Sequence, residues 1–235
     1  MTARLGFDGQ EITPVDTTSA EAIASEVAKL GADATAICFL HSYVNDQHER
    51  AMANAVEAAL PGRPISISSD IACEIREYER MSTTVANAYV QPLTSEYLRS
   101  LQSRLTSLGA EAPLRIMVSS GGFTTADIAA STPVRLLESG PAAGVLSAIN
   151  TAKAAGVDRV LAFDMGGTTA KLCVAVDAKP EISNQFEAGR VRRFKKGSGL
   201  PIMVPSIDMI EIGAGGGAIA HVADLGLLNV GPQSS

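Results

Sequence analysis

The stretch that decides the fold runs from residue 160 to 176 and reads Val160-Leu161-Ala162-Phe163-Asp164-Met165-Gly166-Gly167-Thr168-Thr169-Ala170-Lys171-Leu172-Cys173-Val174-Ala175-Val176. Two apolar runs of strand length, rich in β-branched and aliphatic residues, flank an Asp-x-Gly-Gly-Thr-Thr turn. Paired glycines favour a tight hairpin, because glycine takes positive φ angles without steric cost. The sequence therefore predicts a β-hairpin with its turn at residues 164–169.

The turn has the chemistry of a phosphate site. Successive backbone N–H groups in a glycine turn can point into one concavity that holds an anion, and the hydroxyls of Thr168 and Thr169 add donors. Asp164, at the end of the first strand, is placed to hold hydrated Mg²⁺, which prefers oxygen ligands. The same residues also fit a plain hairpin with a surface carboxylate, and the turn alone leaves both readings open.

Composition restricts the class of protein. The 235 residues are 46% hydrophobic but only 4% aromatic, without tryptophan, so the core is built from small and aliphatic side chains, as in layered α/β proteins. A net charge of −6 argues against a nucleic-acid-binding surface. The N-terminus lacks the apolar segment of a signal peptide, and three scattered cysteines fit a reducing compartment, so we expect a cytoplasmic protein.

Helical and strand patterns alternate in the first part of the chain. A helix beginning at Ser19 and ending at Gly31 precedes a strand at 34–40, a helix at 46–60 and a strand at 65–67. This alternation predicts helices packed against a sheet. A long apolar helical stripe then follows from residue 80 to 108, and Pro92 is expected to break or kink it.

Shorter elements are predicted around the hairpin. We expect strands at 114–118 and 134–137, a short helix from Thr124, and a helix over 142–155 capped by Ser139. Residues 177–200 are polar and predicted to be irregular. Apolar segments follow at 203–204, 207–212 and 225–230.

Several motifs together carry a family resemblance. Asp-Met-Gly-Gly-Thr-Thr at 164–169 resembles a phosphate loop of the actin-like ATPase superfamily. Taken with the blocks at 193–201 and 211–217, the chain resembles the hydantoinase A/5-oxoprolinase family. Weaker blocks of the same family lie earlier in the chain, in the order in which the family has them. They are residues 40–43 with 48–49, 77–80 with 82–84, and 139–144.

The resemblance implies an α/β fold of the actin-like (ribonuclease H-like) ATPase type. Such enzymes use two phosphate loops, and this sequence contains one. The fold is therefore expected to be incomplete and the chain an internal fragment. Residues 1–80 would be the C-terminal part of the family's N-terminal domain, and residues 81–235 the front part of its hydantoinase A domain.

The resemblance also implies an activity, ATP-dependent hydrolysis of a cyclic amide such as a hydantoin or 5-oxoproline through phosphorylation of the amide oxygen. The alternatives are an ATP-dependent carboxylase subunit of the same family and a non-catalytic truncated subunit. The expected cofactors are ATP and Mg²⁺, and the expected partner is a hydantoinase B-type subunit. Asp164 would be the catalytic and metal-binding residue. The expected nucleotide-binding residues are Gly166, Gly167, Thr168, Thr169, Gly215, Gly216 and Gly217.

Two motifs near the hairpin have alternative readings. Residues 213–218 also fit a G-x-G-x-x-A dinucleotide fingerprint, but too little sequence follows for the crossover helix and acidic residue that a Rossmann turn requires. Lys171 could reach a phosphate as a point charge or point to solvent.

Four further features each have a structural and a functional reading. The helix start at Pro141 could bind an anion or be an ordinary cap, and residues 119–122 could be an active-site loop or a turn. His41 and His48 could bind a metal or make structural hydrogen bonds. The basic run at 190–196 could steer an anion or be a solvated loop.

Overall fold

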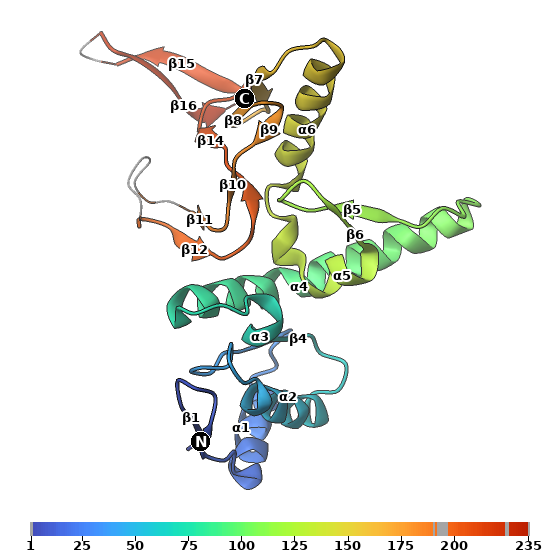
Figure 1. Ribbon diagram of the computed structural model, residues 1–235, viewed down its shortest axis with the longest axis vertical. Helices are drawn as coiled ribbons and strands as arrows, with labels where there is room; N and C mark the ends of the chain where they lie inside the picture. The colour runs from blue at the N-terminus through green and yellow to red at the C-terminus, as the bar shows by residue number, and fades with distance from the viewer. Residues whose placement is uncertain (1, 190, 192–196, 224–225, 235) are drawn as a thin grey trace. The chain divides into compact units, whose positions relative to one another are not determined.

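The computed structural model describes residues 2–189, 191, 197–223 and 226–234 (Figure 1). Backbone contacts divide the chain into two compact units. Unit 1 comprises Met1–Ile116, Thr124–Leu137 and Asn184–Val204, and unit 2 comprises Met117–Phe123, Glu138–Ser183 and Pro205–Ser235. The chain therefore enters each unit more than once.

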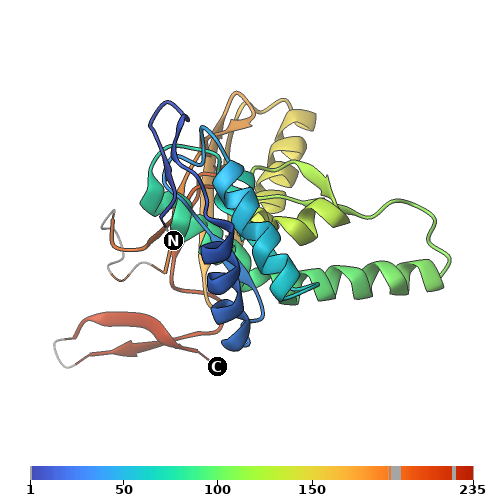
Figure 2. The same cartoon turned by 90° about the horizontal axis from the view of Figure 1, so that it is seen from below.

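Unit 1 begins with a small hairpin and two helices that lie side by side (Figures 1 and 2). Its elements are β1 (Arg4–Leu5), β2 (Glu11–Thr13), α1 (Thr17–Lys29), β3 (Thr35–Ile37), α2 (Gln47–Ala59), β4 (Ile65–Ile67), α3 (Ser68–Ile71), α4 (Glu77–Ser107), α5 (Ala126–Ser131), η1 (Pro133–Leu136, a 3₁₀-helix), β11 (Phe186–Ala188) and β12 (Leu200–Ile202). The short strands β5 (Arg115–Met117) and β6 (Phe123–Thr125) pair with each other where the two units join along the chain.

The predicted alternation of strand and helix is present in unit 1. Strands β3 and β4 pair in parallel, with Thr35 opposite Ile65, and helix α2 makes the connection between them. A parallel pair needs such a crossover. Side chains of α1, α2 and the two strands form one core that includes Ala24, Met52 and Val56.

Helix α1 begins two residues earlier than the sequence predicted. Asp16, not Ser19, is its N-cap, and the Asp16 carboxylate accepts a hydrogen bond of 2.9 Å from the backbone N–H of Ser19. Hydrogen bonds from Ser19 also lower the pKa of Asp16. Since Asp and Ser are both good caps, the sequence pattern alone did not separate them.

Helix α4 is continuous through Pro92, so of the two expected effects of the proline, a break and a kink, the break is wrong. Tertiary contacts can outweigh local propensity, and α4 makes such a contact shortly before the proline. Asn87, fully buried on α4, donates to Ser66 Oγ at 3.0 Å and accepts from the backbone N–H of Val134 at 3.1 Å. The second contact holds η1, which occupies residues predicted to form a strand.

Unit 2 contains the predicted hairpin. Its elements are α6 (Ser139–Ala154), β7 (Arg159–Met165), β8 (Ala170–Val176), β9 (Lys179–Pro180), β10 (Ile182–Ser183), β13 (Ser206–Ile207), β14 (Ile210–Ile212), β15 (Ala218–Val222) and β16 (Leu228–Ser234). Strands β7 and β8 pair antiparallel from Arg159 opposite Val176 to Met165 opposite Ala170, which confirms the hairpin. Short strands also interrupt residues 177–200, a segment predicted to be irregular.

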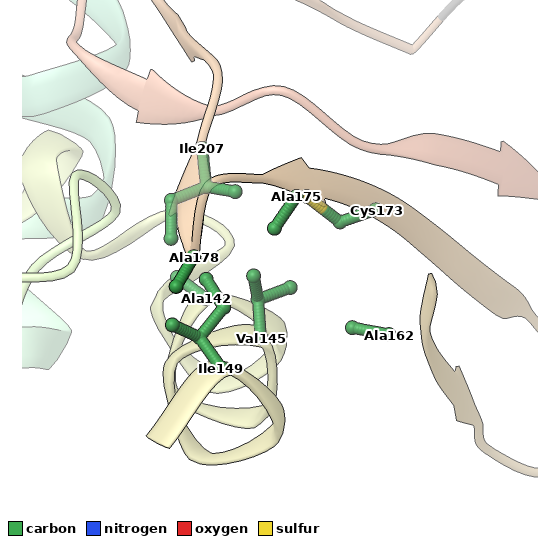
Figure 3. Close-up of a cluster of buried hydrophobic side chains, with 8 residues drawn as sticks. All are labelled: Ala142, Val145, Ile149, Ala162, Cys173, Ala175, Ala178 and Ile207. Atoms are coloured by element: carbon green, nitrogen blue, oxygen red, sulfur yellow. The ribbon is translucent and has the colours of Figure 1, made fainter. Parts of the chain in front are cut away.

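One face of the antiparallel sheet β14–β8–β7 packs on helix α6 (Figure 3). Val145 and Ile149 of the helix point toward Ala162, Cys173 and the other strand residues of this core. Burial raises the pKa of the Cys173 thiol. The opposite face carries exposed apolar side chains. These are Leu161, Phe163, Met165, Val174, Val176 and Ile210.

The compact units do not divide at residue 80, because α4 runs across that position within unit 1. The assignment of residues 1–80 and 81–235 to two family domains rests on sequence resemblance and stays a prediction. Among the described residues, no helix is both long and apolar enough to cross a bilayer.

Candidate nucleotide site

The phosphate loop, defined here as residues 164–169, is the turn of the β7–β8 hairpin. Its ends are closed by a 2.9 Å hydrogen bond from the Gly166 N–H to the Thr169 carbonyl. Asp164 is exposed near the end of β7. Neither Gly166 nor Gly167 has a positive φ angle, so the conformational reason given for the paired glycines is wrong. A Cβ added at Gly167 would meet no atom within 4 Å, which leaves open space above this residue.

Three consecutive amide groups of the loop have no partner among the described residues. Among the residues that the structure describes, the N–H groups of Gly167, Thr168 and Thr169 donate no backbone hydrogen bond. Gly167 and Thr168 are exposed, and Thr169 is half-buried. Adjacent, unpaired N–H groups beside open space are the donors that a phosphate needs.

A second glycine segment, the docking loop of residues 213–217, packs against the phosphate loop. The Gly216 N–H donates to the Gly166 carbonyl at 2.9 Å, and the Gly217 N–H donates to the Gly167 carbonyl at 2.8 Å. Gly215 is buried, and a Cβ on it would lie 2.5 Å from the carbonyl carbon and oxygen of Gly167. Only glycine permits this approach, so the two glycine motifs of the sequence are in direct contact.

The contact changes the interpretation of the docking loop. The N–H groups of Gly216 and Gly217 bind the phosphate loop, so these two donors serve to hold its backbone in place. The predicted nucleotide contact of residues 215–217 stays a prediction. Strand β15 follows the loop directly, where a dinucleotide fingerprint would require a helix, and this agrees with the rejection of that reading.

Lys171 does not point to solvent. Its side chain is 14% exposed and its ammonium forms a close ion pair with Glu138 and a longer one, 3.9 Å, with Glu211. Sequence reasoning missed both glutamates as site residues. Glu138 directly precedes the 139–144 block, but only the strand register shows that Glu211 lies opposite Lys171.

Helix α6 begins beside this ion pair. Its N-cap is Glu138, with a φ of 66°, and not Ser139 as predicted. The Glu138 side chain makes no capping hydrogen bond and reaches Lys171 instead. The carboxylate near the helix start argues against an anion site there, since it already supplies negative charge to that end of the helix.

The phosphate loop fits a metal–nucleotide complex better than a metal alone. The described residues contain no group of three or more His, Cys, Asp or Glu side chains that could hold a metal. Mg²⁺ in nucleotide sites commonly takes one or two carboxylates, several waters and the substrate phosphates. Asp164 could be that carboxylate, and the amides of Gly167 to Thr169 are donors for the phosphates.

The family-like blocks of unit 1 meet in a buried polar cluster. Glu49, fully buried, accepts hydrogen bonds from the N–H groups of Phe39 and Ser69, both at 2.9 Å, and from the Ser68 hydroxyl. Arg80 is also fully buried; it donates to the Phe39 carbonyl at 2.6 Å and lies over the Tyr43 ring. These contacts are structural, because they join α2, α3 and α4 to the segment that follows β3.

The remaining candidate features are His48, residues 119–122 and the basic run. His48 is buried and contacts Glu11 at 2.8 Å, which supports its structural reading. Residues 119–122 form a turn in which the Ser119 carbonyl accepts a hydrogen bond from the Ile207 N–H. The basic residues 190 and 192–196 lie outside the described residues.

The α/β fold class is confirmed by likeness to two solved structures. The chain matches the crystal structure of ATP-dependent caprolactamase from Pseudomonas jessenii with 33% identity and a TM-score of 0.81, over 99% of this chain and 32% of that one. It also matches nucleotide-free acetone carboxylase with 23% identity and a TM-score of 0.79, over 99% of this chain and 32% of that one. The latter similarity concerns the fold alone.

Sequence comparison defines the family. Residues 80–235 match the hydantoinase/oxoprolinase family model, and residues 1–60 match the model of the hydantoinase/oxoprolinase N-terminal region. The chain belongs to the hydantoinase/oxoprolinase family. This confirms the resemblance drawn from the motifs.

Curated relatives are considerably longer than this chain. It is 38% identical to an uncharacterised protein of Methanocaldococcus jannaschii and 34% identical to caprolactamase subunit alpha of Pseudomonas jessenii, over 99% of this chain in both cases. It is 30% identical to 5-oxoprolinase of Saccharomyces cerevisiae over 94% of this chain. The matched regions cover 35%, 32% and 16% of these three relatives, respectively.

Proposed function

We propose that this chain carries one phosphate loop of an enzyme that opens a cyclic amide at the expense of ATP. The observation that carries the proposal is the phosphate loop itself, with three unpartnered amides, open space at Gly167 and an exposed carboxylate at Asp164. Phosphoryl transfer depends mainly on positioning and charge stabilisation, which are the properties that such a loop supplies.

The residues have separate roles in this proposal. The N–H groups of Gly167, Thr168 and Thr169 bind phosphate oxygens, and Asp164 holds Mg²⁺ through its coordinated water. The docking loop keeps the phosphate-loop backbone in one conformation. ATP, when bound, would phosphorylate the amide oxygen and so make the ring carbon electrophilic. Water would add to this carbon, the ring C–N bond would break with the nitrogen taking a proton, and a second water would hydrolyse the resulting acyl phosphate to carboxylate and phosphate.

The substrate class comes from the relatives. Caprolactamase subunit alpha and 5-oxoprolinase, two relatives at 30% identity or more, both have names that denote a cyclic amide. A carboxylase subunit is the second candidate, since the gamma subunit of acetophenone carboxylase is 26% identical and the beta subunit of acetone carboxylase 25% identical. Because several relatives are named as subunits, we also propose a partner subunit of the hydantoinase B type.

The test measures ADP release by the polypeptide that carries this sequence, alone and with its partner subunit. Hydantoin, 5-oxoproline and caprolactam are each compared with acetone or acetophenone plus bicarbonate. The proposal predicts ADP release with a cyclic amide, and a loss of at least about 100-fold in Asp164→Asn, where a magnesium ligand is weakened. ADP release only with a ketone and bicarbonate would select the carboxylase, and none with either class would favour a non-catalytic subunit.

A further inference from the structure

Lys171 lies in a row of residues that includes three acidic ones, Asp164, Glu211 and Glu138. Lys171 on β8 is directly opposite Asp164 on β7 and directly opposite Glu211 on β14. Residues opposite one another in an antiparallel ladder project from the same face of the sheet. This is the face that packs on α6, because Ala162 and Cys173, two residues from Asp164 and Lys171, belong to the α6 core.

Lys171 is fixed at the centre of this row. Its ammonium pairs closely with Glu138 and lies 3.9 Å from Glu211, and its side chain is only 14% exposed. Glu138 makes its contact from a left-handed backbone conformation, with a φ of 66°, which is unfavourable for a non-glycine residue. Glu138 thus adopts an unfavourable backbone conformation and pairs with Lys171 instead of capping the helix. This indicates that the structure holds the Lys171 ammonium at a defined position.

The row of Asp164, Lys171, Glu211 and Glu138 contains more negative than positive charge. Two carboxylates, those of Glu138 and Glu211, pair with one ammonium. A third acidic residue, Asp164, lies opposite Lys171 in the ladder and belongs to the phosphate loop. A bare nucleotide phosphate near this row is repelled, whereas a phosphate that carries a divalent cation is repelled less. The ammonium of Lys171 offsets part of this repulsion, and its pairing with Glu138 limits how much.

We propose that Lys171 is a positioning residue that sets how strongly the phosphate loop prefers the metal complex of a nucleotide to the free nucleotide anion. The carboxylates of the row strengthen this preference, and the Lys171 ammonium limits it. The proposal rests on the proposed function, since it assumes that the loop binds nucleotide. Glu138 has the opposite effect, because its carboxylate pairs with the ammonium and adds a negative charge to the row. Removing Lys171 and removing the Glu138 charge therefore change the affinity for a free anion in opposite directions.

The experiment measures ADP binding by calorimetry, with Mg²⁺ and with EDTA, on the polypeptide that carries this sequence. Lys171→Met is expected to weaken metal-free ADP about tenfold more than Mg–ADP, because the extra negative charge acts mainly on the more highly charged anion. Glu138→Gln is expected to tighten metal-free ADP. The double variant restores the net charge and should return the ratio of the two affinities to near the wild-type value.

Two control variants separate charge from structure. Lys171→Arg keeps the charge and should keep the wild-type ratio. Lys179→Met removes one positive charge from an exposed residue at the far end of the β8 ladder, and it should change the ratio little.

The outcomes are distinguishable. If Lys171→Met and Glu138→Gln both weaken free ADP and Mg–ADP by equal factors, the ion pair is only a structural clamp and the inference is wrong, while the proposed function stands. If the wild-type protein binds neither form of ADP, the proposed function fails and the inference fails with it. Opposite effects of the two variants on free ADP support the inference.

Discussion

The phosphate loop and the docking loop are both rich in glycine, but glycine is needed in the two loops for different physical reasons. A side chain at Gly167 would project into open space, whereas one at Gly215 would lie 2.5 Å from backbone atoms of the phosphate loop. The first glycine leaves room for a ligand and the second permits two backbones to touch. A glycine motif therefore identifies a function only when the surroundings of each glycine are known.

The largest effect is expected at the contact between the loops. Gly215→Ala places a methyl group against the Gly167 carbonyl, and the backbone cannot move aside without breaking the hydrogen bonds from Gly216 and Gly217. We expect unit 2 to lose about 1–3 kcal/mol of stability, in the range of overpacked cores. Thermal unfolding followed by circular dichroism measures this loss. An unchanged melting temperature would show that the loops do not dock as described.

A smaller and different effect is expected at the phosphate loop. Gly167→Ala meets no atom and needs no positive φ, so stability should stay the same or rise by about 0.4–1 kcal/mol. The added methyl group occupies the space proposed for a phosphate, and Mg–ATP affinity should fall about tenfold or more, a loss of about 1.4 kcal/mol. Calorimetry and thermal melts on the same sample provide both values. Undiminished affinity would exclude phosphate binding over Gly167.

The smallest effect is expected one residue along the docking loop. A Cβ on Gly216 would have Gly166 O, at 3.8 Å, as its nearest neighbour, and alanine retains the N–H that donates to this oxygen. Gly216→Ala should therefore change stability by less than about 0.5 kcal/mol. It is a matched control for Gly215→Ala, since both variants add one methyl group to the same loop. Equal destabilisation by the two would contradict the specific role of Gly215.

Local features of the fold were predictable from the sequence. The β7–β8 hairpin follows from two apolar runs around a short turn, and the β3–α2–β4 unit follows from alternating periodicities. Both depend on residues close together in the chain. The 3₁₀-helix η1 was not predictable in this way, because one of its backbone N–H groups is held by Asn87, which lies 47 positions earlier in the sequence.

The candidate site was predictable in its residues but not in its contacts. The Asp-x-Gly-Gly-Thr-Thr pattern identified the phosphate loop, and the glycines at 215–217 were associated with it through the family resemblance. That Gly216 and Gly217 use their amides on the phosphate loop depends on a contact about 50 residues apart in sequence. The surroundings of Lys171 likewise depend on strand register and on where α6 begins.

The most direct test of the account is calorimetric binding of Mg–ATP to the wild-type chain, Asp164→Ala and Asp158→Ala. Asp158 is an exposed acid immediately before β7, so its variant makes the same charge change at the other end of the hairpin. We expect the wild-type chain and Asp158→Ala to bind Mg–ATP, and Asp164→Ala to lose at least about 100-fold in affinity, or about 2.7 kcal/mol. Equal affinity of all three proteins, or no binding by any of them, would contradict a working phosphate loop at residues 164–169.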